Sequence, residues 1–243
     1  MIKKKKKVAL ITGSARRLGR EFALFMADSG WNIALHYHHS AEDASLLLHE
    51  LRSRHHERQF ELFNVDLSDV QSVEYLIPDV IKRMGRLDLI INNASVFEQG
   101  RLAETSAEKI RHHLAVNLEA PLLLMGSFVK SDCSGLIVNL LDSRIDSNLP
   151  SHFAYSLSKK GLAEATRMAA VEFAPKIRVN GLALGALFPP EGKDEKYLAG
   201  VAAKSPMQKP TGVNSILHTL TFLLENESVT GEVIFCDGGM SLL

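Results

Sequence analysis

Short β-rich runs alternate with longer amphipathic stretches along the whole sequence, and this alternation limits the possible folds more than any other feature. The β-rich runs span residues 8–12, 32–37, 59–64, 87–92, 135–141, 177–184 and 232–237. Helical periodicity fills residues 19–29, 41–55, 70–84, 108–129, 152–173 and 213–224. Each helix of this length can carry the chain back to the start of the next strand. The pattern therefore predicts an α/β fold, a doubly wound parallel sheet of about seven strands with helices on both faces.

The length of the chain fits a single domain of this Rossmann type. A chain of 243 residues with 46% hydrophobic residues can bury one large core. No internal repeat or Pro/Gly/Ser-rich linker divides it, so we expect residues 1–243 to form one domain. The least regular stretch, residues 185–210, carries Pro189 and Pro190 beside a weak helical pattern. We expect a substrate loop or lid there, with a surface excursion of no special role as the alternative.

Charge and cysteine content exclude several classes of function. The 28 basic and 28 acidic side chains balance, so neither nucleic acid nor a membrane surface is expected as a partner. No apolar run reaches the roughly 18 residues of a membrane span. The basic run at residues 3–7 leads directly into the first β-rich run, without a signal-type apolar segment, so we expect a cytoplasmic protein. Cys133 and Cys236 lie far apart, and neither a disulfide framework nor a metal site is expected.

The segment Thr-Gly-Ser-Ala-Arg-Arg-Leu-Gly at residues 12–19 joins the first expected strand to the first expected helix. Dinucleotide-binding folds place a pyrophosphate on free backbone amides at this position. Gly13 permits the tight turn and Gly19 permits close packing of the helix. The residues expected to surround the pyrophosphate are Gly13, Arg16, Arg17, Leu18 and Gly19.

The end of the second expected strand predicts which dinucleotide is bound. An acidic residue usually stands there to bind a free ribose 2′-hydroxyl, and none is present. The residues that stand there instead are His36, Tyr37, His38, His39 and Ser40. With Arg16 or Arg17 they offer donors and positive charge to a 2′-phosphate, so we expect NADPH rather than NADH. Histidines that contact a phosphate gain protons more readily, and NADPH affinity should then weaken as pH rises from about 6 to 8.

Polar residues also follow other strands at the ligand edge of such a sheet. Asp66 and Leu67 follow the third run, where the aspartate can accept a hydrogen bond from the adenine amino group; a turn or helix-cap role is the alternative for Asp66. The Asn-Asn-Ala-Ser segment at residues 92–95 follows the fourth run, and its amides are expected near the ribose. The further cofactor contacts expected at this edge are Asn93, Ala94, Ser95 and Gly185.

Tyr155 and Lys159 lie one helical turn apart, so they share a face of their helix. A cation beside a phenol lowers the pKa of the phenol and prepares it as a general acid. Asn117, inside the fourth expected helix, is placed to kink that helix and to hold a water that replaces the proton. Asp142 is the expected partner of Tyr155, and as a carboxylate it would raise the pKa of the phenol and titrate together with it. A shift of one residue would bring Ser143 to that position instead.

These residues make the chain resemble the short-chain dehydrogenase/reductase family along its whole length. The shared features are Thr12-Gly13, the Asn-Asn-Ala turn, Asn117, the Tyr155 and Lys159 pair, and a terminal Asp-Gly-Gly at residues 237–239. Within that family the chain resembles the pteridine reductases and the dihydromonapterin reductases. The features specific to these are the segment at residues 12–19, the segment at residues 36–40, the sequence Asn-Asn-Ala-Ser-Val-Phe at residues 92–97, and Asp142 in place of a serine.

The resemblance implies a reductase that acts on a carbon–nitrogen double bond of a reduced pterin or folate. Phe97 would stack on the pterin, whose other face lies on the nicotinamide. Lys159 would bind the ribose hydroxyls and Tyr155 would deliver the proton. The implied substrate contacts are Arg17, Ser95, Phe97, Asp142 and Tyr155, and the implied assembly is a homotetramer.

Three positions depart from the family pattern, and the sequence is compatible with two other functions. Arg17 stands where the family has the middle glycine of the first turn, His39 stands where it has an arginine, and Leu184-Gly185 replaces a Pro-Gly pair. One alternative function is carbonyl reduction, for example of a 3-oxoacyl thioester, with Ser143 as the hydroxyl. The other is a non-catalytic regulatory protein that binds NADPH.

Overall fold

A computed structural model describes residues 6–190 and 192–243, in which seven parallel strands form one sheet in the order β3-β2-β1-β4-β5-β6-β7. The strands are β1 (Val8–Ile11), β2 (Asn32–Tyr37), β3 (Phe60–Asn64), β4 (Leu89–Asn92), β5 (Gly135–Asp142), β6 (Ile177–Leu184) and β7 (Val233–Cys236). This confirms the prediction of an α/β doubly wound parallel sheet. Residues 3–5 of the basic run lie outside the described residues, and so does residue 191 of the irregular segment.

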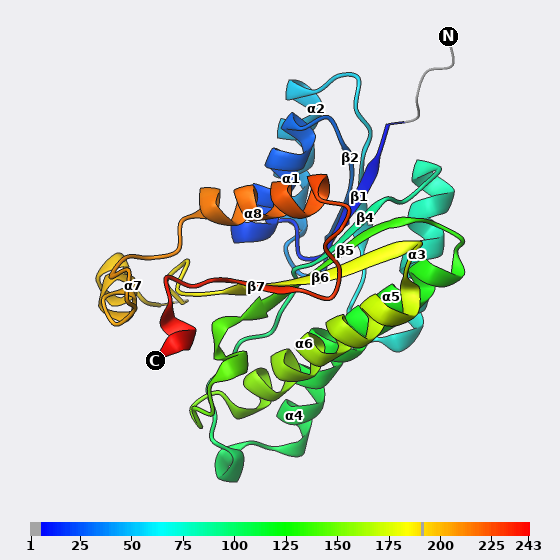
Figure 1. Cartoon of the computed structure of the whole chain (residues 1–243). Coiled ribbons are helices and arrows are strands. Elements are labelled where there is room, and N and C mark those ends of the chain that lie inside the picture. The colour runs from blue at the N-terminus through cyan, green and yellow to red at the C-terminus, as the bar shows by residue number, and fades with distance from the viewer. Residues whose placement is uncertain (1–5, 191) are drawn as a thin grey trace.

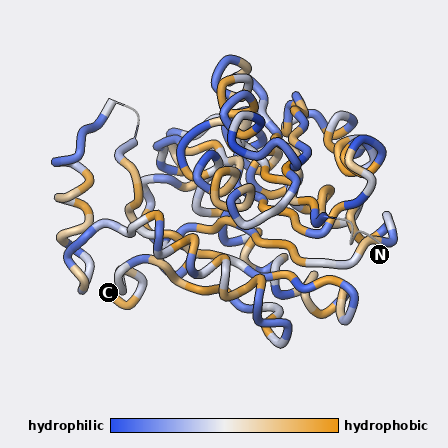
Figure 2. The backbone as a smooth tube through the Cα atoms, turned by 90° about the horizontal axis from the view of Figure 1, so that it is seen from above, coloured by the Kyte–Doolittle hydropathy of each residue, from blue (hydrophilic) through white to orange (hydrophobic). Residues whose placement is uncertain are grey.

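Helices cover both faces of the sheet, as Figure 1 shows. On one face lie α1 (Arg17–Asp28), α2 (Ala41–Arg54) and α8 (Val213–Glu225). On the other lie α3 (Val70–Met84), α5 (Ala120–Lys130) and α6 (Phe153–Phe173), with α4 (Ala107–Leu114) below them. Each set of helices has its own buried apolar cluster against the strands. Figure 2 shows hydrophobic and hydrophilic residues alternating along the turns of the helices.

The helix boundaries follow from local chemistry. Asp69 caps α3 by accepting a hydrogen bond from the amide of Gln71, and Gly85 ends this helix in the left-handed conformation at φ +81°. The single helix expected at residues 108–129 is instead α4, a π-turn at Ala115–Glu119, and α5, which has a proline in its first turn. The weak helical pattern near residue 200 forms α7 (Glu195–Ala202), capped by Asp194.

The strand order reverses at β1, which pairs with β2 on one side and β4 on the other. Crossovers leave in opposite directions at such a point, so a crevice forms beyond the carboxyl ends of the strands. Thr12, Asn93 and Asp142 stand at these ends. In the part of the chain that the structure describes, no helix is long and apolar enough to cross a membrane. Those same residues contain no cluster of three metal-ligating side chains.

Candidate active site

Tyr155 and Asp142 form a direct hydrogen bond at the carboxyl end of β5. The Tyr155 hydroxyl donates to Oδ2 of Asp142 at 2.9 Å. The other carboxylate oxygen, Oδ1, accepts from the amide of Arg144 at 2.8 Å and so caps the short 3-10 helix η3 (Ser143–Asp146). Ser143 is buried, and within the described residues its hydroxyl makes no hydrogen bond to Tyr155. The geometry therefore selects Asp142 over Ser143 as the partner of the phenol.

The Tyr155 hydroxyl is held in its protonated form. Burial raises the pKa of Tyr155 well above its ordinary value, and the nearby Asp142 carboxylate raises it further. The expectation that Lys159 lowers this pKa is not met, because the cation that opposes the rise is Arg144. The phenol is therefore a weak acid that keeps its proton until a base is brought against it.

Lys159 is buried beneath this pair, one turn further along α6. Its Nζ donates to the carbonyl of Leu140 at 2.7 Å and lies 6.0 Å from the centre of the Tyr155 ring. Burial lowers the pKa of Lys159 to about 8, against the opposing effect of Asp142. Lys159 therefore gains or loses its proton at a pH not far above neutral.

Asn117 lies in the π-turn between α4 and α5, and its side chain joins that turn to the loop after β4. Its Oδ1 accepts from the amide of Val96 at 2.8 Å and from the hydroxyl of Ser95 at 3.2 Å. Its Nδ2 donates to the Val96 carbonyl at 2.9 Å and to Ser158 at 3.1 Å. The expected kink is present as the π-turn. The expected water cannot be held by this side chain, because both amide hydrogens and the oxygen are already used by the protein.

Phe97 stands at the mouth of the site with 42% of its surface exposed. Its ring stacks on His152 with centroids 4.7 Å apart and meets the ring of Tyr155 edge-on at the same distance. The guanidinium carbon of Arg144 lies 5.3 Å from the centre of the Phe97 ring. An exposed aromatic face beside the phenol is the kind of surface on which a flat ring can stack. No sequence motif marks His152 or Arg144 as part of the site, although His152 stands at the very start of α6, the helix of Tyr155.

The loop after β1 is built closely enough to carry a pyrophosphate. Gly13 adopts φ +63°, and a Cβ on Gly19 would lie 2.1 Å from the Gly13 carbonyl oxygen, so the two glycines are required as predicted. Arg17 also has a left-handed φ of +49°, at the position where the resemblance predicts glycine. The first turn of α1 has no acidic residue and no side-chain cap, which leaves its amides open to an anion. The side chain of Leu18 is buried, so only its main chain can contact such a group.

His36 is a structural residue and not a phosphate ligand, contrary to the sequence prediction. Its side chain is buried, with Nδ1 accepting from the amide of Gly13 at 3.0 Å and Nε2 bonded to the carbonyl of Val65 at 3.0 Å. Burial lowers its pKa to about 4, so the ring is neutral and carries its proton on Nε2. The imidazole thus braces the glycine turn from below, and both ring nitrogens are engaged.

The other residues of this segment lie nearer the surface. The rings of His38 and His39 are 3.6 Å apart, and His38 Nδ1 lies 3.8 Å from Asp66. Tyr37 is half-buried, and Ser40 precedes α2 without a side-chain cap bond. Arg16 is paired with Asp43 at 2.5 Å, so a phosphate must compete with a carboxylate for its guanidinium. This pairing was missed because Asp43 lies in the next helix.

Asp66 and Asn93 are both used for internal bonds. Asp66 accepts from the amide and hydroxyl of Ser68, bonds that lower its pKa and make it the turn residue that was the alternative interpretation. The side chain of Leu67 is buried. The Asn93 side chain donates to the carbonyls of Thr12 and Gly13 at 2.8 and 3.1 Å. These contacts stabilise the turn from which any adenine or ribose contact would be made.

The amides of Asn93 and Ala94, which were expected to face the ribose, donate instead to the hydroxyl of Thr12 at 2.9 and 3.0 Å. The two amides are therefore not free to donate to a ribose, because a buried threonine hydroxyl at the end of β1 accepts from both, and the contact of this turn with the ribose stays a prediction. Ser95 remains exposed at the end of the turn. Its hydroxyl hydrogen is donated to Asn117, and its oxygen can still accept a hydrogen bond from a ligand.

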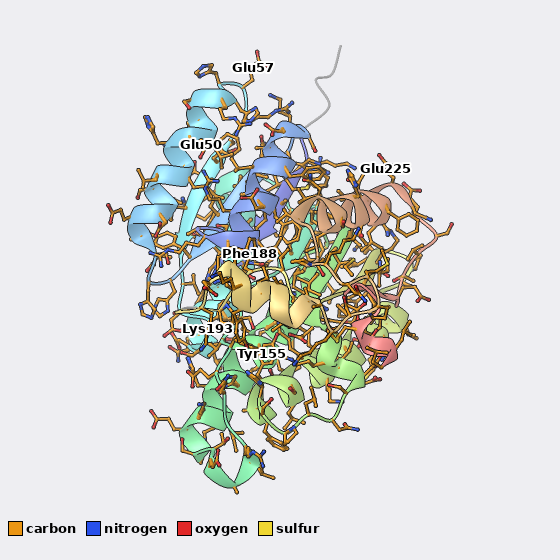
Figure 3. The ribbon with its side chains drawn as sticks, turned by 90° about the vertical axis from the view of Figure 1, so that its left-hand side faces the viewer. Glu50, Glu57, Tyr155, Phe188, Lys193 and Glu225 are labelled. Carbon is orange, nitrogen blue, oxygen red and sulfur yellow. The ribbon has the colours of Figure 1, made fainter. Side chains whose placement is uncertain are left out.

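The irregular segment at residues 185–210 closes over the same edge of the sheet. Arg17 donates to the Pro189 carbonyl at 3.0 Å, and its guanidinium lies 5.1 Å from the centre of the Phe188 ring. Gly185 lies against Asp237, whose Cα would be 2.6 Å from an added Cβ. Figure 3 looks onto this edge, with α7 and the labelled Phe188 in front and Tyr155 labelled below them. The segment is thus linked through Arg17 to the loop at residues 12–19, which is called the cofactor loop below.

The fold and the phenol–carboxylate–ammonium arrangement define an oxidoreductase of the dinucleotide-dependent type. A family model described as enoyl-(acyl carrier protein) reductase matches residues 13–241. The chain therefore belongs to the short-chain dehydrogenase/reductase family. The resemblance inferred from the sequence is confirmed at this level.

The chain is similar to relatives and solved structures that bear two kinds of name, pterin or folate reductases and a 3-oxoacyl reductase. Pteridine reductase 1 of Leishmania tarentolae is 28% identical, with 97% of this chain and 96% of that protein covered. The 3-oxoacyl-[acyl-carrier-protein] reductase of Staphylococcus aureus is 26% identical, with 96% and 98% covered. The crystal structure of an alternative dihydrofolate reductase from Brucella suis in complex with NADP is 30% identical, with a TM-score of 0.92 and 98% and 96% covered.

Proposed function

We propose that this protein is an NADPH-dependent reductase that converts a dihydropterin, of the dihydrobiopterin, dihydromonapterin or dihydrofolate type, to its tetrahydro form. The observation that carries the proposal is the 2.9 Å hydrogen bond from Tyr155 to Asp142, with the exposed ring of Phe97 beside it. The homotetramer that the resemblance implies belongs to the same proposal, and sedimentation measurements test it.

The cofactor part of the proposal rests on the loop at residues 12–19 and the segment that follows β2. The open amides at the start of α1 suit a pyrophosphate. No carboxylate ends β2, and the stacked rings of His38 and His39, followed by Ser40, stand where a 2′-phosphate would lie. Arg16, at the start of α1, would add positive charge if the phosphate displaces Asp43 from it. The Brucella structure, which contains NADP, is similar to 98% of the length of this chain. These features favour NADPH as the cofactor.

When bound, NADPH supplies the hydride, and the acceptor must then gain a proton at the adjacent atom. The Tyr155 hydroxyl is the group that holds this proton in the site. Asp142 accepts the hydrogen bond of the phenol, while its other oxygen is fixed by the Arg144 amide. Lys159, buried below, supplies positive charge near the phenol. Phe97 orients a flat substrate beside the phenol by stacking.

The low acidity of the Tyr155 phenol favours a ring nitrogen over a ketone oxygen as the atom that accepts the proton. Burial and the Asp142 carboxylate both raise the pKa of Tyr155, which makes it a poor acid toward a weakly basic ketone. The nitrogen of a carbon–nitrogen double bond is a stronger base than a ketone oxygen, so it can take a proton from a weaker acid. A carboxylate partner therefore suits a dihydropterin.

Carbonyl reduction is the second candidate, because a 3-oxoacyl reductase is 26% identical over nearly the whole chain. It requires a hydroxyl beside Tyr155, and Ser143 does not provide one in this geometry. A non-catalytic role is opposed by the presence of Asn117, Tyr155 and Lys159 together.

A substrate panel tests the proposal. NADPH oxidation is measured with dihydrobiopterin, dihydromonapterin, dihydrofolate, a quinonoid dihydropterin and a 3-oxoacyl thioester, and Tyr155→Phe serves as the catalytic blank. We expect the preferred dihydropterin to exceed the thioester in kcat/KM by at least about tenfold, a difference of about 1.4 kcal/mol in transition-state binding. Turnover of the thioester alone would establish the second candidate, and NADPH binding without turnover would establish the third.

A further inference from the structure

Arg144 lies between the two parts of the site that the proposed function uses. Its amide donates to Oδ1 of Asp142 at 2.8 Å, and its guanidinium Nε lies 3.9 Å from that same oxygen. On its other side the guanidinium carbon is 5.3 Å from the centre of the Phe97 ring. One side chain thus touches both the carboxylate that holds the phenol and the ring on which a substrate stacks.

The guanidinium has no competing structural partner in the part of the chain that the structure describes. Its Nη1 is buried and makes no hydrogen bond there. A buried donor without an acceptor costs free energy, so this nitrogen does not contribute to the stability of the turn. The backbone amide of residue 144 would complete the Asp142 cap whatever its side chain, so the cap does not require an arginine.

Other charged groups face the same place from neighbouring elements. From α6 come Tyr155, His152 and the buried Lys159, and from α4 comes Lys109, which also acts on His152. Lys159 donates to the Leu140 carbonyl, and Lys109 is bonded to Glu98 and to the Gln99 carbonyl. Arg144 is the cation that lies against both Asp142 and Phe97.

We propose that Arg144 is a positioning residue that holds the Asp142 carboxylate toward Tyr155, supplies its counter-charge, and fixes the Phe97 ring beside the phenol. The inference rests on the proposed function for the identity of the flat substrate. The electrostatic effect agrees with it, since Arg144 lowers the pKa of Tyr155 against the effects of burial and Asp142. Its guanidinium is planar, which allows it to stack on a ring as well as to carry charge.

Two substitutions separate the two parts of this role. Arg144→Gln removes the positive charge beside the hydrogen-bonded Tyr155–Asp142 pair, so this pair should bind one further proton more easily. The acid limb of the kcat/KM profile should then move to higher pH by about one unit, and kcat should fall about tenfold. Arg144→Lys keeps the charge without the planar stack, so it should restore the pH profile and kcat while KM stays several-fold raised.

Arg111→Gln, at an exposed arginine of α4, is the matched control and should leave both constants unchanged. NADPH affinity and melting temperature are measured for every variant, so that a loss of fold is seen directly. An Arg144→Gln profile that coincides with that of the wild type overturns the proposal, and so does an Arg144→Lys profile that coincides with Arg144→Gln. Because the profile is taken on whichever panel substrate is reduced, failure of the pterin assignment does not hide the result.

Discussion

The two ends of the crevice use their polar side chains in opposite ways. At the cofactor end, the side chains of Thr12, His36 and Asn93 bond to the backbone of the glycine turn or of its neighbours. At the catalytic end, Asp142 and Tyr155 bond to each other, and Lys159 is buried below them. At the cofactor end, side chains hold backbone amides in place. At the catalytic end, the side chains are ionisable, and the pKa values of Tyr155 and Lys159 are shifted from their ordinary values.

Cofactor binding therefore depends on the main chain at one end of the crevice, and proton transfer depends on side chains at the other. A pyrophosphate is bound by main-chain donors whose geometry must be rigid, so neighbouring side chains hydrogen-bond to the main chain and hold that geometry. Proton transfer needs groups whose charge can change, so those side chains face each other. Substitutions at the first end should therefore damage stability and cofactor binding together, and substitutions at the second should damage turnover alone.

Tyr155→Phe should give the largest effect on turnover and the cleanest separation of the two ends. Loss of the proton donor should lower kcat by about 10²- to 10⁴-fold. The removed hydroxyl contacts Asp142 and lies away from the glycine turn, so the NADPH dissociation constant should change little. Stopped-flow hydride transfer and fluorescence titration measure the two quantities, and a parallel loss of NADPH affinity would contradict the division.

His36→Leu should be the largest disturbance of the cofactor end. It leaves the Gly13 amide and the Val65 carbonyl without partners, which costs about 2–6 kcal/mol of unfolding free energy at about 1–3 kcal/mol each. His39→Ala, at an exposed neighbour, should leave stability unchanged and lower the preference for NADPH over NADH. Denaturant unfolding of both variants checks this, and equal stability of the two would refute the bracing role of His36.

The same histidine predicts a pH dependence of stability. The pKa of His36 is lowered from 6.5 to about 4, so the folded state binds this proton less well than the unfolded state. Its contribution is therefore complete above about pH 6.5 and is lost as pH falls toward 4. Unfolding free energy measured across this window should fall less steeply in His36→Leu than in the wild type.

Lys159 predicts a smaller effect on turnover at the other end. With a pKa of about 8 it should be largely charged at pH 7 and largely neutral at pH 9, so kcat should fall about tenfold between these values. Tyr155 does not produce this limb, because its pKa is raised well above the usual value. Lys159→Arg, which cannot lose its proton, should lower the rate but flatten the limb. A limb that persists in this variant must come from another group.

Arg17→Gly should give the smallest effect. Arg17 links the loop at residues 12–19 to the segment that contains Pro189. Glycine relieves the left-handed backbone strain of about 1 kcal/mol, while the bond to the Pro189 carbonyl is lost, so the net change in stability should stay below about 1 kcal/mol. Amide exchange at residues 186–188 should become faster because the segment loses its tie to the cofactor loop. Unchanged exchange there would show that Arg17 does not hold the segment.

The sequence predicts the fold and the catalytic pair because both depend on local spacing. Strand and helix periodicity follows from side-chain direction, and Gly13 and Gly19 are required by sterics of the turn itself. Asp142 stands at the last position of β5 and accepts the hydrogen bond of Tyr155, whereas Ser143 begins the 3-10 helix η3. Sequence spacing alone left these two residues as alternatives.

What the sequence does not predict depends on contacts between distant segments. A histidine at the end of a strand can point outward or under the loop, and only packing against β3 decides that His36 points inward. The Arg17 contact spans 172 residues. Arg16 pairs with Asp43 in the next helix, and Arg144 lies against Phe97 in the loop after β4. Both contacts follow from the tertiary fold, so motif comparison does not reveal them.

The substrate preference of Asp142→Ser tests whether this carboxylate turns a general reductase site toward a ring nitrogen. The kcat/KM values for the preferred dihydropterin and for a 3-oxoacyl thioester are measured for both proteins, together with NADPH affinity. We expect dihydropterin reduction to fall by about 10²-fold or more, with NADPH affinity unchanged and thioester reduction unchanged or increased. Wild-type turnover of the dihydropterin by Asp142→Ser would contradict the account.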